Sequence, residues 1–326
     1  MELPAPPRPH DSPRIAVFAP TALVTVTIED GGEHPEVHFH AGGQGVWVAH
    51  MAGALGADVA LSTILGGEPG TLLSALLQAA GVQVHAVKAA AANGVYVHDR
   101  RSGKRTSVAQ VPAPRLQRHE LDELYGVALT DGLDSGVACL TGPQHPDVLD
   151  PSLYTRLAGD LRRNGTTVVA DLTGPALDAA LGGGVDVLKL SDTELVAEGW
   201  AESLELEAIV DTLSRLQRAG ARAVVASRGS QPALALAGDR LIELSGPRFS
   251  AADPAGTGDA MVAALSVSLA RRDQLVNALV LGAAAGALNA TRHGLGTGSR
   301  RQVEELARHV TVRALGQSIL DSAKPA

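Results

Sequence analysis

Short runs of apolar and β-branched residues recur along the chain, separated by longer segments with helical periodicity. In residues 204–219, for example, apolar side chains return every three or four positions and fall on one face of a helix. Alternation of short strands with amphipathic helices is typical of a parallel sheet covered on both faces, an α/β fold. The pattern predicts strands at 14–18, 58–64, 82–87, 136–140, 166–170, 186–190 and 221–227, and helices that include 43–56, 70–80, 151–163 and 204–219.

Other segments depart from this alternation. Residues 36–40 and 93–110 are predicted to form antiparallel strands, the second segment folding about the polar turn 100–104. Residues 234–244 are predicted to form a hairpin. After Asp259 the pattern is helical almost to the end of the chain.

Composition and charge narrow the class of protein. The 326 residues are 45% hydrophobic, enough for one large domain with a small appendage. The net charge of -8 argues against a nucleic-acid or anionic-membrane surface, and we find no uninterrupted apolar run long enough to cross a membrane. The single cysteine, Cys139, lies in an apolar run and is expected to be a buried structural thiol in a reducing compartment. We therefore expect a cytoplasmic protein.

The N-terminal segment has a different composition. Residues 1–13 contain five prolines and no apolar periodicity, which predicts a flexible tail. Residues 14–326 are then expected to form the folded domain, with the irregular strands inserted at about 20–40 and 93–110.

The stretch Asp253-Pro-Ala-Gly-Thr-Gly-Asp259 carries the strongest chemical signal. It places two glycines and an aspartate where an irregular segment becomes an apolar helix. Glycine allows a tight turn and close approach of a ligand, and the first amides of a helix favour an anion. Asp259 would lie beside that anion, placed to take a proton from an attacking hydroxyl. Phosphoryl transfer to an alcohol needs this arrangement. The alternative interpretation is purely structural, namely a glycine-capped helix start with an acidic residue in its first turn.

This stretch resembles the D-x-x-G-x-G-D signature of the ribokinase-like (PfkB) carbohydrate kinases. The similarity is greatest to the hexose-phosphate branch, which includes 1-phosphofructokinase and tagatose-6-phosphate kinase. Further matches occur in family order and cover about residues 14–310; they are residues 41–66, Asp171-Leu-Thr-Gly174, Lys189-Leu-Ser-Asp-Thr-Glu194, Ser227-Arg-Gly229 and Ala287-Leu-Asn289.

The resemblance implies a three-layer α/β/α sandwich with a mostly parallel central sheet. It also implies a small β-sheet lid, built from the two irregular segments, that covers the sugar site and excludes water. Many relatives are dimers through their lids, so a homodimer is expected. An ordinary surface hairpin is the alternative interpretation of the 93–110 segment.

The resemblance also assigns catalytic and nucleotide-binding roles. Asp259 would be the general base, and Gly256, Thr257 and Gly258 would form the anion hole. ATP and Mg²⁺ are the implied cofactors, with Glu194 orienting Mg²⁺ through water. Asp253 occupies a position where some relatives bind a monovalent cation such as K⁺, although Pro254 and Ala255 replace the usual threonines. The residues expected to line the ATP site are Ser191, Glu194, Ser227, Gly229, Ala255 and Asn289.

The acceptor end departs from the family pattern. The expected substrate-binding residues are Gly42, Gly43, Gln44 and Trp47, together with Asp259. Gln44 stands where the hexose-phosphate branch has a lysine, and Trp47 stands where it has an asparagine. The family's sugar-binding aspartate after the first strand is missing, because the chain has no acid near Val24. The basic turn 100–105 is a candidate source of the positive charge that Gln44 does not supply. The alternative is that this turn is a solvated hairpin tip.

Three functions remain open from the sequence. The first is an ATP-dependent kinase of a sugar or sugar phosphate. The second is a nucleoside kinase of the same fold, with Trp47 stacking on a base. The third is a non-catalytic relative that binds a ligand, which the lost sugar aspartate and Ser191 in place of asparagine would favour.

Overall fold

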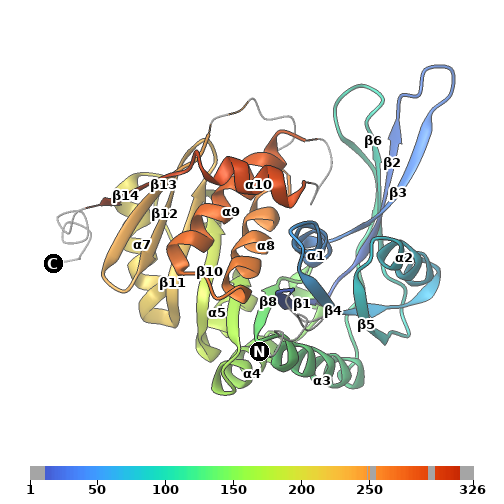
Figure 1. Cartoon of the computed structure of the whole chain (residues 1–326). Helices are drawn as coiled ribbons and strands as arrows, with labels where there is room; N and C mark the ends of the chain where they lie inside the picture. The colour runs from blue at the N-terminus through green and yellow to red at the C-terminus, as the bar shows by residue number, and fades with distance from the viewer. Residues whose placement is uncertain (1–11, 248, 250–254, 293–297, 316–326) are drawn as a thin grey trace, which may run out of the picture.

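A large twisted sheet forms the centre of the computed structural model, which describes residues 12–247, 249, 255–292 and 298–315 (Figure 1). Within these residues, ten strands pair in the order β14-β13-β12-β11-β10-β9-β8-β1-β4-β5. The strands from β11 to β5 pair in parallel, whereas β12, β13 and β14 add an antiparallel edge. Parallel pairing brings the carboxyl ends of the central strands to one edge of the sheet, where ligands bind in open α/β folds.

The strands are β1 (Arg14–Ala19), β2 (Leu23–Glu29), β3 (Glu36–Gly42), β4 (Asp58–Leu65), β5 (Gln83–Lys88), β6 (Gly94–Asp99), β7 (Thr106–Val111), β8 (Val137–Thr141), β9 (Thr167–Asp171), β10 (Val185–Ser191), β11 (Ala221–Arg228), β12 (Gln231–Ala237), β13 (Arg240–Ser245) and β14 (Thr311–Leu315). The helices are α1 (Gln44–Ala54), α2 (Gly67–Ala79), α3 (Arg118–Ser135), α4 (Ser152–Arg163), α5 (Gly174–Gly183), α6 (Asp192–Ala197), α7 (Leu206–Ala219), α8 (Thr257–Ala270), α9 (Leu275–Ala290) and α10 (Arg300–Ala307).

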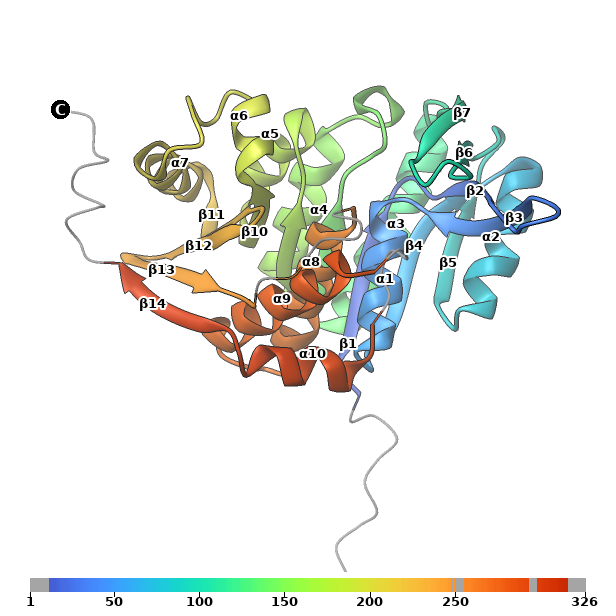
Figure 2. The same cartoon turned by 90° about the horizontal axis from the view of Figure 1, so that it is seen from above.

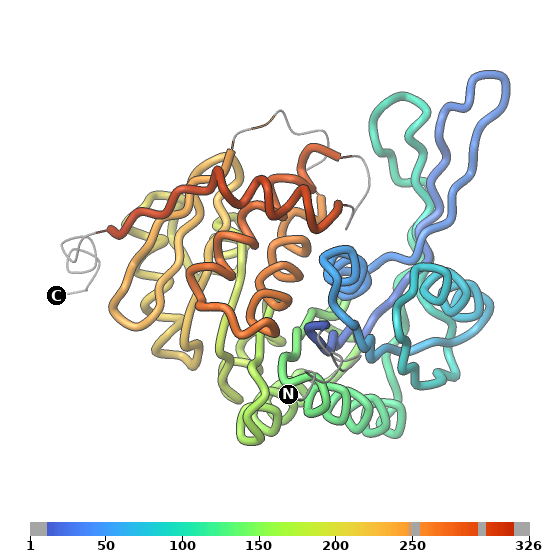
Figure 3. The backbone as a smooth tube through the Cα atoms, in the orientation of Figure 1, coloured from blue at the N-terminus to red at the C-terminus, as the bar shows by residue number. Residues whose placement is uncertain are grey.

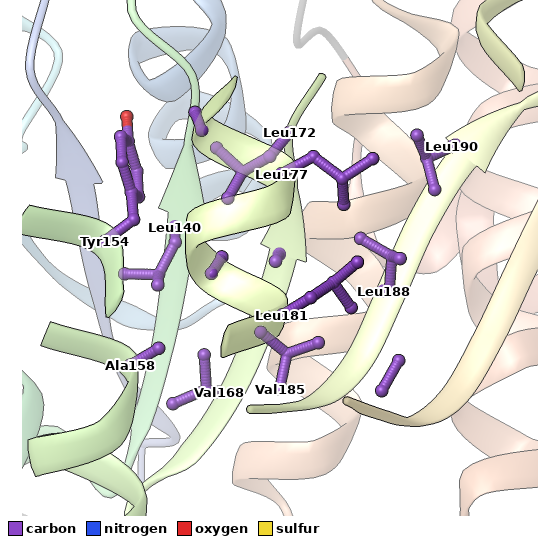
Figure 4. Packing of buried hydrophobic residues seen from close by; sticks show 14 of the residues in the cluster. Leu140, Tyr154, Ala158, Val168, Leu172, Leu177, Leu181, Val185, Leu188 and Leu190 are labelled. Carbon is purple, nitrogen blue, oxygen red and sulfur yellow. The ribbon is translucent and has the colours of Figure 1, made fainter. Parts of the chain in front are cut away.

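Helices cover both faces of the large sheet (Figure 2). One hydrophobic cluster packs α3, α4, α5, α6 and α7 against it, and a second packs α1, α2, α8, α9 and α10 against the other face. In the first cluster, Leu140, Tyr154 and Leu172 interdigitate between strands and helices (Figure 4). The result is a three-layer α/β/α sandwich whose helices fix the positions of the strand ends.

A separate four-stranded sheet, which we call the lid sheet, rises beside α1 (Figures 1 and 3). Its order is β3-β2-β6-β7, with β2 and β6 parallel and the two outer strands antiparallel to them. The chain passes from β3 directly into α1 (Figure 3). The lid sheet is therefore continuous with the helix that carries the predicted substrate loop.

Most predicted elements are confirmed within one to three residues of their ends, including the hairpin β12–β13 and the two strands β6 and β7. The prediction of helix almost to the C-terminus is wrong, because residues 311–315 form β14 on the edge of the sheet. This strand is mostly exposed and pairs with β13, where Arg313 contacts Glu243 at 3.1 Å. The strand is only five residues long and follows a helical segment closely, so the sequence pattern did not separate it from that helix.

Three other sequence expectations can be compared with the structure. Cys139 is a free, buried thiol in β8, and burial raises its pKa, as expected of a structural cysteine. None of the helices in the described residues is long and apolar enough to cross a membrane. Residues 1–11 of the predicted tail lie outside the described residues.

Candidate active site

Helix α8 begins with a glycine turn. Its N-cap, Gly256, has φ 72°, in the left-handed region that glycine adopts without strain. The first hydrogen bond of the helix runs from the Ala260 N–H to the Gly256 carbonyl at 2.9 Å. The amides that precede Ala260 in this turn therefore have no acceptor within the helix. Together with the helix dipole, they favour an anion at this end.

Asp259 lies in this first turn, on a helix whose next nine residues are buried, from Ala260 to Ser268. Burial raises the pKa of the Asp259 carboxyl to about 7. The neighbouring carboxylates Asp171 and Glu194 add to this rise, whereas the Lys189 ammonium opposes it. A carboxylate with a pKa near neutrality is a far better proton acceptor at physiological pH than an ordinary aspartate.

Two charged side chains are buried at the ends of the neighbouring strands β9 and β10. Lys189 Nζ donates a hydrogen bond to Asp171 Oδ2 at 3.3 Å, and each side chain is 4% exposed. Burial raises the pKa of Asp171 although the ammonium opposes this shift. Burial lowers the pKa of Lys189, but Asp171, Glu194 and Asp259 outweigh burial, so its pKa is raised and it stays charged.

Gly258 allows the buried ammonium to approach α8. A methyl group at Gly258 would lie 2.3 Å from Lys189 Nζ, so any larger residue would collide with it. Lys189 therefore lies directly against the turn where an anion is favoured. One cation among three carboxylates leaves the site negative, which suits a phosphate group that arrives with a divalent cation.

The residues fit ATP bound with Mg²⁺. Thr257 Oγ1 is buried at the start of α8 and has no hydrogen-bond partner among the described residues, so a phosphate oxygen could pair with it. Within the same described residues, no group of three or more His, Cys, Asp or Glu side chains could hold a metal ion by itself. Mg²⁺ keeps several waters and shares its coordination with substrate phosphates, so it needs no complete protein cage.

Glu194 and Ser191 form a capping box at the start of α6. Glu194 Oε2 accepts hydrogen bonds from the Ser191 N–H at 2.7 Å and the Ser191 hydroxyl at 2.8 Å. Glu194 also acts electrostatically on Asp171, Lys189 and Asp259. Its carboxylate is thus both a helix-capping group and a member of the charged cluster.

The other predicted nucleotide residues gather at the same edge of the sheet. Ser227 pairs with Ser191 across β10 and β11, and Gly229 occupies the turn after β11 with φ 56°. The Asn289 side chain of α9 donates to the Ala255 carbonyl at 2.8 Å, which ties α9 to the residue before the glycine turn. Asp253 lies outside the described residues.

Gln44, predicted as a substrate ligand, is engaged with the protein itself. Its Oε1 accepts the Gly142 N–H at 2.8 Å, in the loop after β8. Its side chain also hydrogen-bonds Asp171, which lowers the pKa of that carboxyl and partly offsets its burial. Gln44 therefore links the start of α1 to the ends of β8 and β9. Its two contacts stabilise the charged cluster.

The remaining predicted substrate residues lie around Gln44. Gly42 ends β3, and Gly43 is the N-cap of α1 with φ 107°, where a methyl group would lie 2.7 Å from the Thr21 carbonyl. Trp47 lies in the first turn of α1 and is half-buried.

Sequence reasoning missed the roles of Asp171 and Lys189. Both stand in motifs that matched the family, but the motifs alone did not show that the two side chains meet. The available signal was a charged residue at or near the carboxyl end of each of two apolar strands, 18 residues apart. Buried charges are rare unless paired, so the pattern predicts partners in one site.

The sequence is similar to those of known proteins. Residues 18–302 match the family model described as pfkB family carbohydrate kinase. The ATP-dependent 6-phosphofructokinase isozyme 2 of Mycobacterium tuberculosis is 33% identical over 82% of this chain and 78% of its own length. The 1-phosphofructokinase of Rhodobacter capsulatus is 29% identical over 74% of this chain and 79% of its own.

Solved structures support the fold. The phosphofructokinase-2 from Escherichia coli in complex with potassium aligns with TM-score 0.80 at 24% identity, over 90% of this chain and 98% of that one. The ribokinase of Arabidopsis thaliana complexed with ribose and ATP aligns with TM-score 0.70 at 19% identity, over 91% of this chain and 99% of that one. The chain therefore has a ribokinase-like fold and belongs to the pfkB family of carbohydrate kinases, enzymes that transfer phosphate to a sugar hydroxyl.

Proposed function

We propose that this chain transfers the γ-phosphoryl group of ATP to a hydroxyl of a hexose phosphate. The observation that carries the proposal is the position of Asp259, with its pKa raised to about 7, in the anion-binding turn of α8. Relatives named 6-phosphofructokinase and 1-phosphofructokinase support a hexose phosphate as the acceptor.

Each residue of the site has a distinct role in this proposal. Asp259 orients the attacking hydroxyl and takes its proton, and the amides of Gly256, Thr257 and Gly258 stabilise charge on the phosphoryl group. Lys189 adds a fixed positive charge beside that turn, and Glu194 orients waters of Mg²⁺. ATP, when bound with Mg²⁺, supplies the phosphoryl group and the counter-charge.

The nucleotide and cation assignments belong to the same proposal. Ser191, Ser227, Gly229, Ala255 and Asn289 would line the ATP site, because they gather at one edge of the sheet beside α8. A monovalent cation near Asp253 is supported by the Escherichia coli phosphofructokinase-2 structure that contains potassium.

ADP formation across a panel of acceptors tests the proposal. The panel comprises fructose 6-phosphate, fructose 1-phosphate, tagatose 6-phosphate, fructose, ribose and adenosine, each with ATP and Mg²⁺. Turnover with a hexose phosphate at a kcat/KM at least 100-fold above that with fructose is the expected result. Turnover with adenosine alone would make the chain a nucleoside kinase. ATP binding without turnover on any acceptor would contradict catalysis.

The rate should depend on pH through Asp259. Because the base must be ionised to accept a proton, kcat/KM for the acceptor is expected to rise with pH to a plateau, with a midpoint near the pKa of about 7. Initial rates from pH 5.5 to 9 at saturating ATP and Mg²⁺ measure this. A profile that is flat between pH 5.5 and 8 would show that proton transfer to Asp259 does not limit the rate.

We also propose that two copies pair through the lid sheet. Phe39 pairs with Val26 and Val37 with Ile28 across β2 and β3, so these side chains share one face of the sheet. Phe39 is 51% and Val37 52% exposed, and Val111 at the other edge is 57% exposed. An exposed apolar face of this kind usually marks a protein interface.

A charge introduced on that face should dissociate the dimer. Phe39→Lys is expected to raise the dimer dissociation constant by about 30-fold or more, because an aromatic side chain at the centre of an interface contributes about 2 kcal/mol or more. Light scattering across a concentration series measures the constant. Leu133→Lys, at an exposed leucine of α3, is the matched control. A wild-type chain that is monomeric at high concentration would contradict the pairing.

A further inference from the structure

Among the described residues, the loop Gly42–Gly43–Gln44 and the cluster beside it offer no available positive charge to an acceptor. Gln44 is neutral and is already bonded to Gly142 and Asp171. Lys189 is buried and paired with Asp171. A hexose phosphate carries a phosphate of its own, in addition to the one transferred, and a doubly charged phosphate is usually bound by arginine or lysine. The charge must therefore come from another element.

One face of the lid sheet points toward the site. A methyl group at Gly94, the first residue of β6, would lie 3.3 Å from Gln144 Oε1 in the loop after β8. Side chains two residues apart on a strand share a face, so Tyr96 and His98 lie on this side, His98 about 13 Å farther out. Val24, on the opposite face, is buried. We call the first side the inner face.

His98 and Arg105 form an unusual pair on the inner face. Arg105 Nη2 donates a hydrogen bond to His98 Nε2 at 2.8 Å, so Nε2 is the unprotonated ring nitrogen and Nδ1 carries the hydrogen. His98 is 5% exposed, and its Nδ1 has no partner among the described residues. Burial, then Arg105 and Arg100, lower the pKa of His98, which keeps the ring neutral.

Arg105 keeps its full charge in this arrangement. Its neighbour in the turn, Arg101, is neutralised by Asp99, with Nη2 to Oδ2 at 2.6 Å. Arg105 is exposed, and within the described ranges no carboxylate lies within ion-pair distance of it. A neutral imidazole orients the guanidinium without cancelling its charge. The remaining N–H donors of Arg105 are then free to bind an anion in a fixed direction.

We propose that Arg105 binds the phosphate that the acceptor already carries, and that His98 is the positioning residue that aims its guanidinium. This inference rests on the proposed function, because it requires a sugar phosphate as the acceptor. The lid sheet then supplies the charge that the Gly42–Gly43–Gln44 loop lacks.

Arg105→Gln tests the first half of the proposal. With the hexose phosphate that the wild type uses, the KM for this acceptor is expected to rise about 10- to 100-fold, the effect of losing one charge-assisted hydrogen-bonding group. The KM for ATP should change less than twofold. Arg101→Gln, whose charge is already paired with Asp99, is the control and should leave both constants unchanged. A rise in the KM for ATP instead would assign Arg105 to the nucleotide and overturn the proposal.

Two substitutions at His98 test the positioning role. His98→Gln keeps a hydrogen-bond acceptor for Arg105 and should keep the acceptor KM within about threefold of wild type. His98→Leu removes the acceptor, and the KM should rise nearly as much as in Arg105→Gln. In the His98→Leu/Arg105→Gln double variant the two effects should not multiply, because they act on one contact. Equal KM values in His98→Gln and His98→Leu would exclude positioning by this hydrogen bond.

Calorimetry separates this inference from the proposed function. Fructose 6-phosphate and fructose 1-phosphate are titrated into the wild type and Arg105→Gln, with fructose as the uncharged reference. Affinity for a hexose phosphate that falls in Arg105→Gln supports the inference even if the wild type shows no turnover, in which case only the proposed function fails. Equal affinity in both proteins, or no binding to the wild type, overturns the inference.

Discussion

Asp259→Asn is expected to lower kcat by about 10²- to 10⁴-fold, the usual contribution of a positioned general base. The asparagine side chain keeps the shape of the carboxyl and removes its capacity to accept a proton. Because the α8 amides and Lys189 remain, the KM for ATP should change little. Single-turnover and steady-state ADP formation measure the loss.

The same variant should be more stable than the wild type at high pH. The folded-state pKa of Asp259, about 7, lies above its unfolded value of 3.8. The folded state therefore binds more protons between these values, and the free energy of unfolding of the wild type falls as pH rises from about 4 to 7. Asparagine avoids this cost, so Asp259→Asn is expected to gain about 1–3 kcal/mol at pH 8 and almost nothing at pH 4. Urea unfolding at both pH values measures the difference.

Loss of activity with a gain in stability distinguishes a catalytic role from misfolding. Glu68→Gln is the matched control, since Glu68 is an exposed acid in the first turn of α2 and lies outside the proposed site. It should leave kcat unchanged. Activity of Asp259→Asn within tenfold of wild type would show that another group accepts the proton, or that proton transfer is unimportant.

The sequence was sufficient to predict the secondary-structure elements that have a strong local pattern of apolar residues. Apolar strands such as β8, β9 and β10 are visible because both faces of the sheet are covered. The turn at Gly256 and the acid at Asp259 are visible because the glycines stand directly before a long apolar run, where a helix must begin. The exposed strand β14 was missed, since its pairing with β13 depends on tertiary contact and not on its own apolar residues.

Interactions between distant segments could not be read from the sequence. Gln44 was predicted as a substrate ligand from its place in the glycine loop, but its partners are Gly142, in the loop after β8, and Asp171, at the end of β9. The pairing of His98 with Arg105 depends on the turn between β6 and β7 and on a register shift in their pairing between Val97 and His98. Sequence patterns give the face on which a side chain lies, and only the packed structure gives its partner.

The second large effect is expected at Lys189. Lys189→Met removes the ammonium and leaves the Asp171 carboxylate buried without its partner. Breaking a buried ion pair in this way usually costs about 3–5 kcal/mol of stability. The free energy of unfolding measured in urea at pH 8 should fall by that amount. Activity should also fall sharply, because the charge beside the α8 turn is lost.

A double variant separates the two effects of Lys189. In Lys189→Met/Asp171→Leu neither side chain is charged, so most of the lost stability should return, while activity stays low because the phosphate still lacks the ammonium. In Lys189→Met alone the pKa of Asp259 should rise further, since Lys189 is the group that opposes the carboxylates around it. The midpoint of the residual pH–rate profile should then move above 7. Full activity in the double variant would show that Lys189 serves only to neutralise Asp171, and that the α8 amides alone stabilise the transferring phosphoryl group.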